Sequence, residues 1–196
     1  MAVADPKETL HSYLRSARGS MMWKLDGLSA YDVRRPLTPT GTNLLGLVKH
    51  LSIVEVWYFG TAFDRPFPEH LPWWDDDAED TADAWATEDE TQAEIVDRYR
   101  RAAAHADVTI EALDLDARGM VPFWPGSTEV TLHQMLVHAL AETTRHAGHA
   151  DILRQHLDGA VGMAPDNSTV PEHDAAWWEA HCARIEQAAT RAARAE

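Results

Sequence analysis

Residues 132–158 concentrate side chains that could bind a metal ion or move protons. The six are His133, His138, Glu142, His146, His149 and His156. The pattern predicts one helix here, on which Glu142 and His146, four positions apart, lie one above the other on the same face. A carboxylate and an imidazole in that relation can hold one divalent metal if a third ligand comes from elsewhere, and His50, on another apolar helix, is the candidate. Two histidines and a glutamate form a ligand set of catalytic zinc sites, which keep one position open for water or substrate.

The neighbouring histidines leave several interpretations open. His138 and His149 share the helical face of Glu142 and His146, and either could be a ligand, orient a ligand or act as an acid or base. This face should point inward, where an unpaired Glu142 would cost several kcal/mol; a bound metal removes that cost. A single histidine on an apolar face is more often a core residue, and histidine-rich faces can also be solvated. Zinc suits the predicted set best, although nickel, iron or manganese would accept it.

Other side chains could contact a substrate. Arg145 and Arg154 flank the predicted ligand turn and could hold a carboxylate of a thiol or of a substrate; surface salt bridges are the alternative for both. Tryptophans could line an apolar pocket or simply pack in the core, and the candidates are Trp57, Trp73, Trp74 and Trp124.

The positions of apolar residues predict an all-α protein in one domain. Helices are expected at about residues 6–28, 43–59, 91–113, 132–157 and 172–193. The first four argue for a four-helix bundle with its core at about 6–160, followed by a C-terminal extension over 161–196 with a short fifth helix. A long acidic loop rich in Pro, Trp and Asp must connect the second and third helices. We find no convincing strand pattern.

Composition restricts the classes of function. The chain of 196 residues has 32 acidic and 17 basic residues and a formal charge of -15, which disfavours binding to nucleic acid. The single cysteine, Cys182, excludes an internal disulfide and suits a reducing cytoplasm. We expect no signal peptide and no membrane span. Contacts through Trp177 and Trp178 could support a homodimer.

Four segments resemble the DinB/YfiT-like superfamily. They are GTNLLGLVKHL, PWWD, DAWATEDET and ETTRHAGHADILRQHLDG. More narrowly, they are similar to the branch that contains mycothiol-dependent maleylpyruvate isomerase and mycothiol S-transferases, over about residues 8–160. The resemblance implies a four-helix bundle with a metal held by His50, Glu142 and His146, the glutamate being typical of the isomerase-like branch. That isomerase has an additional C-terminal domain that contributes to its site, so maleylpyruvate isomerisation is not expected here.

These observations lead to a metal-dependent transferase as the first hypothesis. The metal would activate a low-molecular-weight thiol, similar to mycothiol, for conjugation to an electrophilic small molecule, with His149 or His138 moving protons. A metal-dependent hydrolase, with water in the open position, is one alternative. A non-catalytic metal-binding stress or interaction protein is another.

Overall fold

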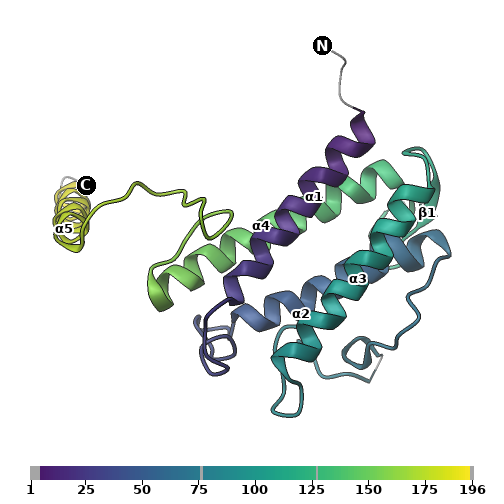
Figure 1. Ribbon diagram of the computed structural model, residues 1–196, viewed down its shortest axis with the longest axis horizontal. Helices are drawn as coiled ribbons and strands as arrows, with labels where there is room; N and C mark the ends of the chain where they lie inside the picture. The colour runs from purple at the N-terminus through teal and green to yellow at the C-terminus, as the bar shows by residue number, and fades with distance from the viewer. Residues whose placement is uncertain (1–4, 76, 127, 195–196) are drawn as a thin grey trace.

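The computed structural model describes residues 5–75, 77–126 and 128–194, and in this part of the chain the protein is mostly helical, as predicted. The five α-helices are α1 (Pro6–Met22), α2 (Leu44–Glu55), α3 (Gln92–Ala112), α4 (Leu132–Asp158) and α5 (Ala175–Ala193). Helix α1 packs along α4, and α2 packs against both α3 and α4. Helix α5 lies apart from the other four at the end of an extended linker (Figure 1). None of the described helices is long and apolar enough to cross a membrane.

Local capping explains where the helices begin and end. Asn43 and Thr131 accept hydrogen bonds from backbone N–H groups in the first turns of α2 and α4. Thr91 and Glu94 form a reciprocal capping box at the start of α3. Gly159, with a φ of 81°, ends α4 in the left-handed conformation that glycine adopts without steric cost. These signals are local, so the ends of α3 and α4 are close to those predicted.

Two predicted helices are shorter than expected. Helix α1 ends at Met22 and continues as a 3₁₀ turn over Trp23–Leu25, and α5 begins at Ala175. In the second predicted helix, α2 changes at Glu55 into a π-helical turn over Val56–Gly60. A π turn holds an extra residue, so the side chains of this turn are rotated relative to those of the α-helix before it.

The core lies among α1–α4 and contains the apolar faces that the sequence predicted. Its buried members include Leu14 of α1, Ile95 of α3, and Met135 and Leu153 of α4. A buried ion pair connects α1 and α2 within this core. The guanidinium of Arg18 donates to both carboxylate oxygens of Glu55, at 2.7 and 2.6 Å, and both side chains are buried.

The sequence shows no convincing strand pattern, yet the described residues include a small sheet beside the helices. A two-stranded antiparallel sheet joins α3 to α4, formed by β1 (Arg118–Met120) and β2 (Glu129–Thr131). Each strand has only three residues, which is too short for an alternating pattern to stand out. The sheet packs closely on the turn after α2, since a Cβ at Gly119 would come within 2.4 Å of the carbonyl oxygen of Ala62. The loop between the strands is thereby held beside α2.

Candidate metal centre

Three residues that the sequence singled out meet between α2 and α4. His50 lies on α2, and Glu142 and His146 lie one turn apart on α4. One potential ligand atom from each can be chosen so that all three lie within 4.8 Å of one another. The imidazole rings of His50 and His146 have their centroids 5.0 Å apart, and Nε2 of His146 is 3.5 Å from Oε2 of Glu142. Small adjustments of these side chains would bring all three within the roughly 2.0–2.2 Å at which zinc binds nitrogen and oxygen.

Asp83, from the long acidic loop, orients His50. Its Oδ2 lies 2.6 Å from Nδ1 of His50. The hydrogen bond from His50 is the main cause of a lowered pKa for the Asp83 carboxyl, so this group is ionised at neutral pH. A carboxylate that accepts from one nitrogen fixes the tautomer and leaves Nε2 available as a ligand, an arrangement typical of metal-binding histidines. Sequence reasoning missed Asp83, because the loop contains many acidic residues and nothing in their spacing distinguishes this one.

The acidic loop is fixed on α2 by close backbone contact and by a buried lysine. A Cβ at Gly46 would come within 1.8 Å of the carbonyl oxygen of Ala84, so only glycine allows this approach. The buried side chain of Lys49 donates to the carbonyl oxygen of Trp85 at 2.9 Å and to Oε2 of Glu90 at 2.8 Å. Asp83 immediately precedes this anchored segment. Its position over His50 is therefore determined by tertiary contacts.

His146 is in the chemical state that a metal requires. Burial is the largest cause of the drop in its pKa to about 4, and the nearby His50 adds to it, so the ring is neutral at pH 7. Its Nδ1 is buried and has no hydrogen-bond partner among the described residues. Metals bind neutral imidazole, and a buried ring nitrogen without a protein partner is costly unless something else satisfies it. Two imidazoles and one carboxylate thus fit a divalent transition metal.

The two other histidines of this face lie on opposite sides of the cluster. The His149 ring is exposed, and its centroid is 5.5 Å from that of His146. The His138 ring is half-buried against Tyr58 and Trp124, with centroid distances of 4.7 and 4.8 Å. Burial lowers the pKa of His138, so this ring is also neutral at pH 7 and can accept a proton. Both remain candidates for proton transfer.

The two arginines that were candidates for substrate binding, Arg145 and Arg154, lie in different environments. Arg145 is exposed on α4. Arg154 is buried and directed toward the end of α1, where it donates to the carbonyl oxygens of Lys24 and Asp26 at 2.9 and 2.8 Å. Its other donors bind the carboxylate of Asp158. The structure therefore does not bring Arg154 to the cluster, and its contacts are those of a residue that connects helix ends.

Of the predicted pocket tryptophans, Trp57 and Trp74 line a cavity that also contains His50 and Glu142. Trp124 packs beside it and donates to the hydroxyl of Tyr58 at 3.4 Å. Trp73 is buried in a satellite cluster of the core, where it stacks with cations rather than lining the cavity.

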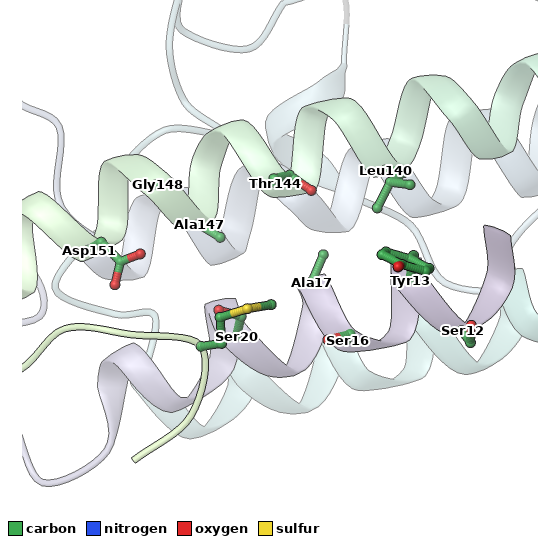
Figure 2. Close-up of a pocket in the computed structure, with 11 residues that line it drawn as sticks. Ser12, Tyr13, Ser16, Ala17, Ser20, Leu140, Thr144, Ala147, Gly148 and Asp151 are labelled. Atoms are coloured by element: carbon green, nitrogen blue, oxygen red, sulfur yellow. The ribbon is translucent and has the colours of Figure 1, made fainter. Parts of the chain in front are cut away.

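A separate cavity of about 590 Å³ lies between α1 and α4, with Ser16, Ala17, Thr144 and Ala147 on its walls (Figure 2). At 3.6 residues per turn, Thr144 lies on the face of α4 opposite Glu142 and His146. None of its described lining residues is a histidine, glutamate or cysteine. The one carboxylate among its described lining residues, Asp151, pairs with Lys24, so this groove does not gather a set of metal ligands.

Comparison with known families places most of the chain in one family. A family model of mycothiol S-transferases matches residues 9–159. The chain belongs to the mycothiol S-transferase family. This family is part of the DinB/YfiT-like, mycothiol-related branch that the sequence motifs resembled. A search of curated proteins finds no match. The matched range covers α1 through α4, with Asp83 and the three clustered residues, and ends before α5.

Proposed function

We propose that this protein is a metal-dependent S-transferase that conjugates a low-molecular-weight thiol of the mycothiol kind to an electrophilic small molecule. The convergence of His50, Glu142 and His146 carries the proposal, because it brings together three potential ligands, the number that catalytic zinc sites complete with water or substrate. Membership of the mycothiol S-transferase family supports the choice of a thiol. We further infer that α1–α4 are the four-helix bundle of the DinB/YfiT type and that the resident metal is zinc.

A divalent metal held by these residues would supply one function, which is to stabilise the thiolate form of the thiol at neutral pH. The protein's own residues do the rest. Asp83 holds the His50 ring in one tautomer and orientation. When the sulfur–carbon bond forms and the leaving group departs with its bonding electrons, the thiol proton must pass to a base. Neutral His138 and exposed His149, on either side of the cluster, are the candidate acceptors.

The first test combines metal analysis with a conjugation assay. Purified wild-type protein should contain about one metal ion per chain and should conjugate mycothiol to a bimane or nitroaromatic electrophile. His50→Ala, Glu142→Ala and His146→Ala should each lose both properties. His156→Ala is the matched control, because His156 is an exposed histidine on the same helix outside the cluster. Wild-type protein that binds no divalent metal, even when it is supplied, would refute the proposal.

The same experiment separates the alternatives. Stoichiometric metal with ester or amide hydrolysis but no conjugation would favour the hydrolase. Metal without either activity would favour a binding or stress protein. Homodimer formation through Trp177 and Trp178 remains a prediction; both lie on α5, which has no buried side chain. A cytoplasmic location likewise remains a proposal from the cysteine content.

A further inference from the structure

Two separate cavities border the metal-ligand cluster. One, of about 260 Å³, is lined by His50, Glu142, His138 and a group of aromatic side chains, and is called here the aromatic cavity. The other, of about 480 Å³, is lined by His50, His146 and His149 together with the acidic loop, and is called here the threonine-lined cavity. His50 borders both. A metal held by the cluster would therefore be reachable from two sides.

The walls of the aromatic cavity come from three segments that are distant in the sequence. Trp57 lies in the π turn after α2, Trp74 in a 3₁₀ turn of the acidic loop, and Phe123 in the loop between β1 and β2. The Trp57 ring centroid is 5.1 Å from that of Phe123 and 6.1 Å from that of Trp74. Trp74 and Phe123 retain 43% and 49% of their accessible surface, and their ring centroids are 6.5 Å apart. A planar apolar molecule between them would remove this surface from water.

The volume and charge of the aromatic cavity restrict the class of molecule that it can bind. At about 260 Å³ the cavity is smaller than the roughly 300–1,000 Å³ typical of sites for drug-sized ligands, which favours one or two fused rings. None of its described lining residues is a lysine or arginine, so no side-chain cation lies in this cavity to pair with an anionic group of a ligand. The chain as a whole carries a formal charge of -15. An anionic substrate would therefore find no arginine here, in contrast to the hypothesis that Arg145 and Arg154 could hold a carboxylate.

The threonine-lined cavity offers hydrogen-bonding groups instead. Thr40, Thr42 and Thr81 lie on its walls, together with Asp83 and His149. Hydroxyls that both donate and accept, beside a carboxylate that accepts, suit a polyhydroxylated molecule. Its volume is also nearly twice that of the aromatic cavity. The two sides of the cluster are thus chemically different.

We infer that the two reactants approach the metal centre from different cavities, and that the electrophile is a neutral, planar aromatic molecule of one or two rings bound between Trp57, Trp74 and Phe123. This inference rests on the proposed transferase function. The thiol occupies the threonine-lined cavity, with its sulfur at the shared boundary near His50. There the sulfur attacks an electrophilic ring or benzylic carbon, the leaving group departs with its bonding electrons, and the thiol proton passes to a base.

The test measures binding by calorimetry with unreactive probes, so it needs neither thiol nor turnover. Full-length protein is titrated with 1,3-dinitrobenzene, which is neutral, and with 3-nitrobenzenesulfonate, an anionic counterpart whose sulfonate is a poor metal ligand. We expect dinitrobenzene to bind at least tenfold more tightly than nitrobenzenesulfonate. Phe123→Ala and Trp74→Ala should each weaken dinitrobenzene binding at least tenfold. Both side chains are partly exposed, so these variants should fold.

Trp85→Ala is the matched control, because Trp85 is an equally exposed tryptophan that lines the threonine-lined cavity. It should leave dinitrobenzene binding within twofold of wild type. Equal affinity for the two probes, or an equal loss in Trp85→Ala and Phe123→Ala, would overturn the inference. Protein that binds dinitrobenzene as expected but conjugates no thiol would refute the proposed function alone and leave the ligand class of this cavity standing.

Discussion

Replacing Asp83 should weaken metal binding although Asp83 is not itself a proposed ligand. Its carboxylate accepts a 2.6 Å hydrogen bond from Nδ1 of His50 and retains only 19% of its side-chain exposure. Partners of this kind typically contribute 10- to 100-fold in metal affinity, or about 1.4–2.8 kcal/mol. Asp83→Asn keeps an acceptor oxygen but loses the charge, so we expect a loss of about tenfold. Asp83→Ala leaves the Nδ1–H of His50 without this acceptor, so the loss should approach about 100-fold.

Zinc affinity would be measured on metal-free protein by competition with a chromophoric chelator, and the melting temperature with and without zinc gives an independent readout. Asp80→Asn is the control, since Asp80 is an exposed aspartate of the same loop. The graded order, wild type tighter than Asp83→Asn and Asp83→Asn tighter than Asp83→Ala, is the specific expectation. If Asp83→Ala binds zinc within twofold of wild type, or if Asp80→Asn has the same effect, the orienting role assigned to Asp83 is wrong.

Three further outcomes are expected. Gly46→Ala should push the acidic loop away from α2, because the new Cβ would collide with the carbonyl oxygen of Ala84. The free energy of unfolding should fall by about 1–3 kcal/mol, and zinc binding should weaken. An unchanged zinc affinity would contradict the role of this contact in positioning the loop. Glu55→Gln removes one of the two carboxylates that pair with buried Arg18, the other being Asp107, and should cost about 1–3 kcal/mol in denaturant unfolding. A loss below about 0.5 kcal/mol would show that the pair is not important. Burial lowers the pKa of His146 to about 4 from 6.5, so as pH falls between these values the unfolded chain takes up a proton before the folded one. Metal-free wild-type protein should therefore lose stability over that range relative to His146→Gln, and melting curves that stay parallel across pH would contradict the assignment.

Local sequence signals determined most of the helical structure. The capping residues Asn43, Thr91 and Thr131 and the terminal Gly159 act within a few residues of themselves, so the ends they set could be predicted. The four-residue spacing of Glu142 and His146 likewise places both on one helical face without reference to any other part of the chain. The apolar stripe of α3 was predicted for the same reason. Each of these features depends on interactions between near neighbours.

The features that were not predicted depend on contacts between residues that are far apart in the sequence. The strands β1 and β2 are too short to produce a periodic pattern and exist because they pair with each other against the turn after α2. The change from α-helix to π turn at Val56–Gly60 follows no residue signal that we recognise in the sequence. The direction of Arg154 is decided by carbonyl groups at the end of α1, which no spacing on α4 reveals.

The candidate site also combines features that the sequence determined with features that only the tertiary structure decided. The sequence by itself identified His50, Glu142 and His146, because rare residue types at helical spacing restrict the possible chemistry. Only the tertiary structure brought α2 against α4 so that the three meet, and only it placed Asp83 beside His50. The aromatic cavity, too, depends on three segments that are separated in the chain. Side-chain chemistry and helix faces are encoded locally, whereas the meeting of groups from different segments is decided by packing of the whole chain.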